Sequence, residues 1–148
     1  MAVNIRNMKI SDYEQVYALW LSCVGMGLND IDDSRDGIER FLARNPDTCF
    51  VAEENGHILG AILAGNDGRR GYIYHTAVSP EHRHKGIAAA LVNEAMKALK
   101  ALGITKTALV VFSKNADGND FWEKFGFTER TDLVYRNKAL TKMIRTDT

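Results

Sequence analysis

The spacing of apolar residues predicts helices in four parts of the chain. The first is expected near 11–23, where apolar residues recur at i, i+3, i+4 and i+7. The second, near 34–44, has fewer apolar positions and ends before Asn45-Pro46. The third follows Gly86 with a regular apolar stripe, and a short fourth helix is expected at 117–125. The stripe of the third helix comprises Ala88, Leu91, Val92, Ala95, Leu99 and Leu102.

Apolar runs bounded by turn residues predict the strands. Early strands are expected at 3–6, 48–54, 57–65 and 70–78. The pair Asn55-Gly56 is favoured in two-residue hairpin turns, so the strands on either side of it should be antiparallel. A second glycine-containing turn before residue 70 predicts that the next strand continues the antiparallel meander.

A β-branched run at 105–112 predicts a strand on the far side of the third helix. Because strand–helix–strand connections are right-handed crossovers, this strand should be parallel to the one at 70–78. Two more strands are expected at 127–130 and 132–136. The order β-α-α-β-β-β-α-β-α-β-β predicts an α/β fold of the α+β type, with a mixed sheet.

Length and charge predict a single globular domain. The 148 residues suffice for one compact core, and we expect one domain over 1–148, with its core at about 3–137 and a polar, partly loose tail at 138–148. The formal net charge is zero, so no overall field attracts nucleic acid or an anionic membrane, and neither is expected as a partner. The sequence has no apolar run long enough to span a bilayer and no signal-peptide core at its N-terminus.

The two cysteines, Cys23 and Cys49, both lie in apolar patterns. They are expected to be reduced thiols, although the sequence alone leaves a disulfide open. Reduced thiols make the cytoplasm the simplest location.

The run from Arg83 to Ala88, RHKGIA, opens the third helix directly after the strand at 70–78. The first N–H groups of a helix have no internal partners and, with the positive end of the helix dipole, favour phosphate. Gly86 allows close approach of an anion, and the basic side chains before it add charge. A basic turn that only starts a surface helix would have the same composition.

This run resembles the Arg-x-x-Gly-x-Ala loop of the GNAT superfamily of acyl-CoA N-acetyltransferases. The segment from Asn115 to Phe127, NADGNDFWEKFGF, resembles the family's Asn-x-x-Ala-x-x-Phe-Tyr-Glu-Lys-x-Gly-Phe motif without a gap. The resemblance implies a GNAT-type fold, in which the two parallel central strands splay apart and pantetheine lies between them. It also implies an acetyl-CoA-dependent N-acetyltransferase that needs no metal, and it leaves a homodimer open.

By resemblance, backbone amides of the loop hold the diphosphate of acetyl-CoA, and main-chain groups at the end of the strand before it bind pantetheine. The Val78 N–H would also polarise the thioester carbonyl. The cofactor-binding residues implied in this way are Ala77, Val78, Arg83, His84, Lys85, Gly86, Ile87, Ala88 and Asn115. Asn115 also fits the N-cap of the short fourth helix.

Trp122 stands where the family has its tyrosine general acid. An indole N–H donates a hydrogen bond but releases no proton near neutral pH, so Trp122 is better interpreted as a core or cofactor-stacking aromatic. The candidates for the general base are Tyr72, Tyr74 and His75. The two tyrosines share one face of a regular strand and are better interpreted as a pocket wall, whereas His75 joins them only if the strand has a bulge.

The acceptor is predicted less sharply than the acyl donor. Asp30, Asp32 and Asp33 lie in the region that forms one lip of the acceptor site in this family, and they would favour a cationic amine. A solvated, helix-capping loop is the simpler interpretation of the same residues. The turn at 66–71 resembles an Asp-Gly-x-Arg-Gly turn of a small bacterial GNAT subgroup of poorly defined substrate. Val110 replaces the catalytic glutamate of ribosomal-protein N-acetyltransferases, so that subclass is not supported.

The sequence therefore predicts transfer of an acetyl group from acetyl-CoA to a primary amine, on a small molecule or a peptide, by direct attack in a ternary complex. Two alternatives stay open. One is an acyl-CoA-binding module with weak or no catalysis, because of Trp122. The other is a non-enzymatic domain that uses the same fold to bind a partner.

Overall fold

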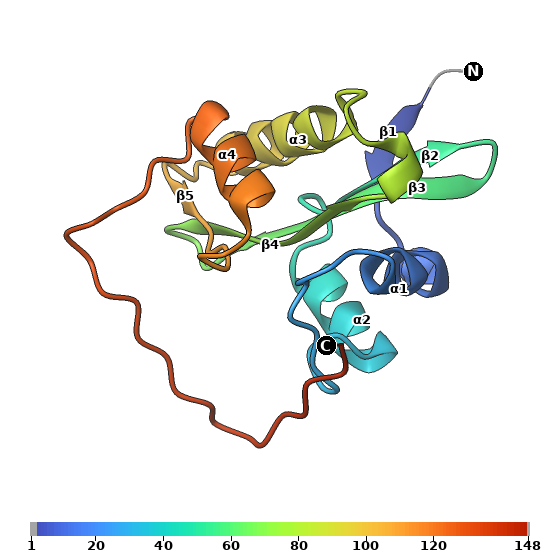
Figure 1. The fold of residues 1–148 in the computed structure, drawn as a ribbon. Coiled ribbons are helices and arrows are strands. Elements are labelled where there is room, and N and C mark those ends of the chain that lie inside the picture. Colours follow the sequence, from blue (N-terminus) through green and yellow to red (C-terminus); the bar gives the residue numbers. More distant parts are fainter. Residues whose placement is uncertain (1–2, 148) are drawn as a thin grey trace.

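In a computed structural model that describes residues 3–147, a five-stranded mixed sheet lies at the centre of the protein (Figure 1). The strands follow one another across the sheet in chain order, and all but the last pair are antiparallel. Their bounds are β1 Asn4–Asn7, β2 Phe50–Glu54, β3 His57–Asn66, β4 Gly71–Val78 and β5 Thr107–Ala108. The mixed fold and the order of these five strands confirm the predicted fold class.

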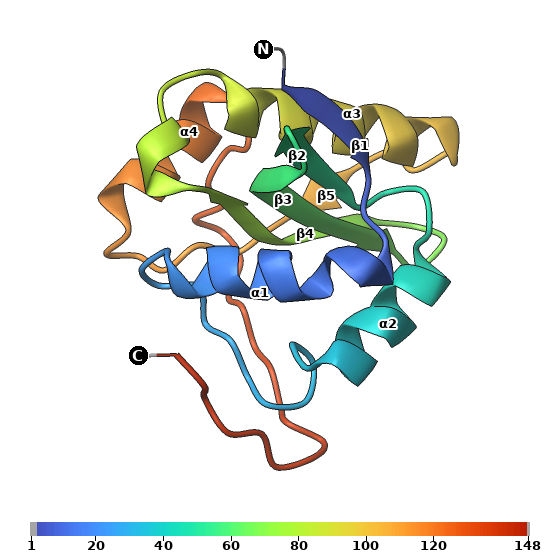
Figure 2. The same ribbon diagram turned by 90° about the vertical axis from the view of Figure 1, so that its right-hand side faces the viewer.

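Helices cover both faces of the sheet (Figure 2). On one face lie α1, Tyr13–Leu21, and α2, Arg35–Arg44; on the other lie α3, Ile87–Ala101, and α4, Ala116–Lys124. Each face has its own core: Trp20 is fully buried on the α1 side and Leu91 on the α3 side. Within residues 3–147, no helix combines the length and apolarity needed to cross a membrane.

The parallel pair separates soon after it begins. β5 contacts β4 only through Gly71 opposite Thr107 and Tyr72 opposite Ala108, and the chain then leaves the sheet. From Ile73 to Val78, the edge of β4 that faces away from β3 therefore has no strand partner among the described residues. This is the splay between two parallel strands that the resemblance implies, although β5 lies at the edge of the sheet and not at its centre.

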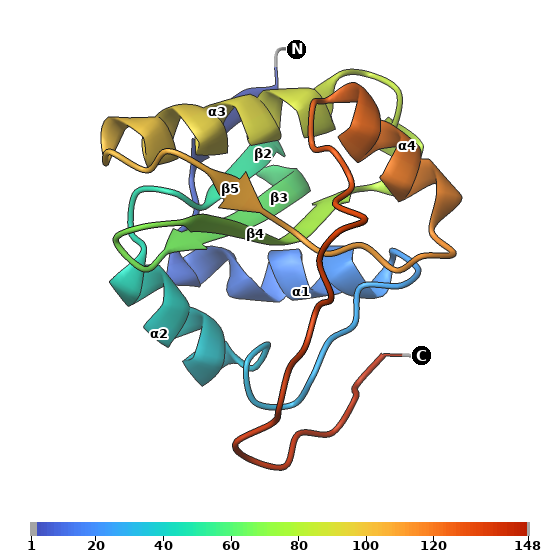
Figure 3. The ribbon, with the colours of Figure 1, turned by 90° about the vertical axis from the view of Figure 1, so that its left-hand side faces the viewer.

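The strands expected at 127–130 and 132–136 do not form, and the strand expected at 105–112 shrinks to two residues. A strand needs a continuing partner edge, and β5 turns away from the sheet before it can offer one. Residues 133–135 are instead exposed in an extended arm (Figure 3).

The C-terminal arm runs from α4 to the loop between α1 and α2 (Figures 1 and 3). There the Asp30 amide donates to the Ile144 carbonyl, and the Thr146 amide donates to the Leu28 carbonyl, both at 3.0 Å. The Asp147 carboxylate accepts from the Leu28 amide at 2.8 Å. The exposed main chain of the loop thus gives Ile144, Thr146 and Asp147 partners, and the partly loose tail expected at 138–148 stays a prediction; residue 148 lies outside the described residues.

A bulge interrupts the pairing of β3 with β4. Ile62 lies opposite Thr76, whereas Ala64 lies opposite Ile73, so β4 has one extra residue between these pairs. The bulge places two consecutive side chains, Tyr74 and His75, on the face covered by α1 and α2, where Tyr74 contacts Phe41 and His75 contacts Trp20.

Candidate active site

The loop between β4 and α3 presents free backbone N–H groups. Gly86 is the N-cap of α3 with a left-handed φ of 81°, and His84 has a φ of 63°. Among the described residues, no protein acceptor takes the amides of residues 84–88, and the first helical bond runs from the Ala90 amide to the Gly86 carbonyl at 3.0 Å. A Cβ at Gly86 would meet no atom within 4 Å, so the loop is open to a bulky anion. This geometry suits a phosphate group.

Arg83 turns toward the end of β4. Its Nε donates to the Val78 carbonyl at 3.2 Å, and its second terminal nitrogen lies 3.4 Å from Cys23 Sγ. The guanidinium thus ties β4 to the end of α1, and its contact with phosphate stays a prediction. Its neighbours His84 and Lys85 are exposed at the loop surface.

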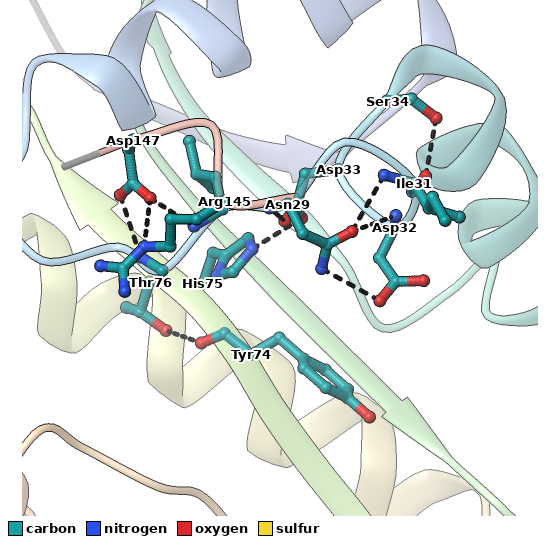
Figure 4. A network of polar contacts seen from close by, with 12 residues as sticks. Asn29, Ile31, Asp32, Asp33, Ser34, Tyr74, His75, Thr76, Arg145 and Asp147 are labelled. Atoms are coloured by element: carbon teal, nitrogen blue, oxygen red, sulfur yellow. Dashed lines mark hydrogen bonds and ion pairs between the residues drawn. The ribbon is translucent and has the colours of Figure 1, made fainter. Parts of the chain in front are cut away.

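His75 and Asp33 form a hydrogen-bonded pair on the opposite side of the sheet from α3 (Figure 4). His75 Nε2 lies 2.7 Å from Asp33 Oδ1, and the Asp33 side chain is only 5% exposed. The Asn29 amide donates to Asp33 Oδ2 at 2.9 Å, and the Tyr13 hydroxyl donates to the Asp33 carbonyl at 2.7 Å. The carboxylate is therefore fixed by the loop between α1 and α2.

This pairing assigns the proton on the imidazole. A carboxylate only accepts hydrogen bonds, so the hydrogen bond assigns a proton to Nε2 of His75, and in the neutral form of the ring the lone pair is on Nδ1. Within residues 3–147, Nδ1 has no protein partner, and it is not among the buried unpaired atoms. His75 is therefore oriented to accept a proton at Nδ1.

The acidic residues of the same loop have different roles. Asp33 is buried and both of its carboxylate oxygens are occupied, so the geometry does not support it as a direct acceptor contact. Asp30 Oδ1 accepts the Ile144 amide at 2.7 Å. Asp32 is exposed, and among the described residues its carboxylate accepts one hydrogen bond, from the Asn29 side-chain amide at 3.1 Å. Asp32 is thus the acidic residue best placed to meet a substrate.

Tyr72 and Tyr74 form an aromatic surface next to His75. Their ring centroids are 4.7 Å apart, and Phe41 packs edge-on against Tyr74 at 5.5 Å. Burial raises the pKa of both phenols, the nearby Tyr135 raises it further, and Asp32 adds to the rise at Tyr74. Both phenols are therefore neutral near pH 7, which suits a pocket wall better than a base.

Trp122 and Asn115 have clear structural partners. The Trp122 ring packs edge-on against Phe121 at 5.0 Å and Phe127 at 5.1 Å, beside the core under α3. Asn115 is the N-cap of α4, and its Oδ1 accepts from the Gly118 amide at 2.9 Å. Their contacts with acetyl-CoA remain predictions.

Sequence reasoning missed the residues that hold His75 in place. Tyr13, Asn29 and Trp20 fix Asp33 and His75, yet they come from a helix and a loop far from β4 in the chain. No local motif links these positions, although the fully buried Trp20 is part of the predicted apolar stripe. Within residues 3–147, no three or more His, Cys, Asp or Glu side chains lie together so that they could hold a metal ion.

Known proteins share both the sequence and the architecture. The acetyltransferase (GNAT) family model matches residues 13–127. An acetyltransferase of Pectobacterium atrosepticum is 37% identical over 93% of this chain and 96% of its own. One from Photorhabdus laumondii is 38% identical over 86% of this chain and 88% of its own.

Solved structures give the same fold at lower identity. Ard1 of Thermoplasma volcanium superposes with a TM-score of 0.77 at 21% identity, covering 86% of this chain and 84% of that one. The PaiA N-acetyltransferase of Thermoplasma acidophilum, solved in complex with coenzyme A, has a TM-score of 0.76 at 21% identity, over 86% of this chain and 91% of that one. With a family model that spans most of the chain and relatives that align along nearly all of it, the protein belongs to the GNAT acetyltransferase family.

Proposed function

We propose that the protein transfers the acetyl group of acetyl-CoA to an amine by direct attack in a ternary complex. The observation that carries the proposal is the set of amides at residues 84–88 that have no acceptor within residues 3–147, beside the edge of β4 that has no strand partner there. The amides fit a diphosphate, and the free strand edge fits the amide groups of pantetheine. The coenzyme A complex of the structurally similar PaiA supports this donor.

In this mechanism His75 acts as the general base. The amine loses one proton to Nδ1, directly or through water, as its nitrogen attacks the thioester carbonyl and the C–S bond then breaks. Asp33, held by Asn29, keeps the ring in the tautomer that can accept that proton. The Val78 N–H stabilises the developing oxyanion, and one such donor is typically worth about 3 kcal/mol.

The leaving group does not require an acid at Trp122. A free thiol has a pKa near ~8.5, so a thiolate can depart and take its proton from water. The packing of Trp122 against Phe121 and Phe127 suits a wall of the thioester pocket. The absence of a tyrosine at this position nevertheless favours a second candidate function, an acyl-CoA-binding module with weak catalysis.

Calorimetry and a thiol-release assay test the proposal. Acetyl-CoA should bind one site per chain, and an amine panel should release free CoA. His75→Ala should lower kcat by about 10²- to 10⁴-fold and leave the acetyl-CoA Kd unchanged. His57→Ala, at an exposed histidine where β3 begins, is the control and should change neither.

The outcomes separate the candidate functions. Failure to bind acetyl-CoA would contradict both. Binding without thiol release, in the wild type and in Trp122→Tyr, would favour the non-catalytic module. Higher kcat in Trp122→Tyr would show that a missing acid limits the wild-type rate.

A further inference from the structure

An aromatic wall lies beside the proposed base, on the acceptor face of the sheet. The wall consists of Phe41, Tyr72 and Tyr74, with ring centroids 4.7 Å apart for the tyrosine pair and 5.5 Å apart for Phe41 and Tyr74. Tyr74 is 51% exposed, so about half of its surface is accessible to a ligand. Contiguous exposed apolar surface often marks a ligand-binding site, and the three rings of the wall are contiguous.

The bulge in β4 aligns this wall with the base. Because Tyr74 and His75 project from the same face, a molecule with its amine at His75 can continue along the strand over the tyrosines. Tyr72 lies three residues before His75, and an extended strand rises about 3.3 Å per residue, so the wall extends at most about 10 Å from the base. In Figure 4 the loop that carries Asp32 and Asp33 lies over the strand segment that carries Tyr74 and His75.

The charge next to the wall is negative and available. Asp30 and Asp33 are occupied by the Ile144 amide and by His75, whereas Asp32 is exposed and close enough to Tyr74 to affect its phenol. Neutral tyrosine faces attract cations through the ring quadrupole, and a neighbouring carboxylate adds Coulomb attraction. Neutral tyrosine rings next to an exposed carboxylate therefore form a surface that can bind an alkylammonium group.

We propose that the aromatic wall and Asp32 bind a second cationic group of the acceptor while its reacting amine lies at His75. The acceptor class is then a diamine or a longer polyamine. Its two nitrogens would be separated by at most about 10 Å, the distance over which the wall extends from His75. This inference rests on the proposed acetyl transfer and adds to it the identity of the acceptor. A monoamine of equal length fills the same space but leaves Asp32 without a counter-ion.

The test compares diaminoalkanes of increasing chain length with alkylamines of the same carbon number in the thiol-release assay. The wild type should show a lower KM for diamines, with an optimum at an intermediate length. Asp32→Asn and Tyr74→Leu should each raise the diamine KM about two- to fivefold, with little change in kcat or in the monoamine KM. Tyr74→Phe keeps a ring and should retain the preference.

Asp36→Asn is the matched control, because it removes the same charge from an exposed position in the first turn of α2. It should leave the diamine KM unchanged. Equal KM values for diamines and monoamines, or an equal effect of Asp32→Asn and Asp36→Asn, would overturn the proposal while acetyl transfer itself stands. If no amine is acetylated, calorimetry of diamines on the CoA-loaded protein decides: binding weakened by Asp32→Asn supports the wall as a cation site, and no binding overturns it.

Discussion

Gly86→Ala tests the diphosphate loop through backbone conformation alone. Gly86 has a φ of 81°, and an added Cβ would meet no atom within 4 Å, so the substitution causes no clash. An L-residue in the left-handed region costs about 1 kcal/mol, which corresponds to a loss of about 3 °C in Tm for a domain of this size. The loop can relieve this strain only by rotating the peptides on either side of residue 86.

Such a rotation redirects the amides proposed to hold the diphosphate. A hydrogen bond to a charged group contributes about 1.5–3 kcal/mol, so the loss of one such bond weakens binding by about 10- to 150-fold. We therefore expect Gly86→Ala to raise the Kd for CoA at least about tenfold. Isothermal titration calorimetry measures the Kd, and differential scanning calorimetry measures the Tm.

Gly103→Ala is the matched control. Gly103 follows the opposite end of α3 with a φ of 85°, and a Cβ there would also meet nothing within 4 Å. The two variants should lose the same few degrees of Tm, but Gly103→Ala should keep the wild-type Kd for CoA. Equal CoA affinity in both variants would refute the assignment of the diphosphate to this loop.

Three further predictions concern stability and reactivity. Arg6→Ala should lower the free energy of unfolding by about 2 kcal/mol in urea denaturation, because it leaves the nearly buried Asp12 carboxylate without the guanidinium 2.8 Å away. Burial raises the pKa of Cys49 to about 12, so a maleimide should not label it in the native protein at pH 7. Burial opposes ionisation of Asp147, but hydrogen bonds from Arg145 and from the loop amides outweigh it and lower the pKa. Because the pKa of Asp147 is lower in the folded protein, its ionised carboxylate stabilises the arm at pH values above the unfolded-state pKa of about 3.9. This stabilisation is lost at lower pH, so NMR should show the Leu28 amide shifting as the pH falls below about 4.

Each of these predictions has its own control. Lys124→Ala breaks an exposed pair with Asp120 and should cost at most about 1 kcal/mol, so an equal loss in both variants would contradict the argument for Arg6. Labelling of Cys49 at the rate of the half-buried Cys23 would show that the native core opens readily. Persistence of the acid shift in Asp147→Asn would assign it to another carboxyl group.

Elements that depend on nearby residues were predictable from the sequence. The turn Asn55-Gly56 has the two positive φ values, 53° and 79°, that favour this pair in a hairpin. Most of the predicted apolar stripe of the third helix is buried, and Gly86 is its N-cap; at the two ends of the stripe, Ala88 is half-buried and Leu102 is exposed. In both cases the residues that predict the turn or the helix are the same residues that form it.

Elements that depend on distant partners were not predictable. Residues 127–136 have the composition of strands but find no sheet edge, and the end of the arm pairs instead with residues 28–30. The bulge in β4 has no glycine or other local signal, yet it determines the face on which His75 lies. Asp33 belongs to a polar loop by its neighbours in sequence and becomes a buried partner of His75 only in three dimensions.

One strand, β4, organises both halves of the proposed reaction. Among the described residues, its outer edge has no strand partner beyond Tyr72 because β5 leaves the sheet, and such an edge is what an extended, amide-containing cofactor arm can bind. Its face carries His75 because of the bulge, and a regular pleat would turn that ring toward α3. A thioester bound along the outer edge of β4 and an amine bound at the face that carries His75 are then brought together at the same end of the strand. The two irregularities of the sheet, the splay and the bulge, are therefore the features that allow this fold to bring the two substrates together.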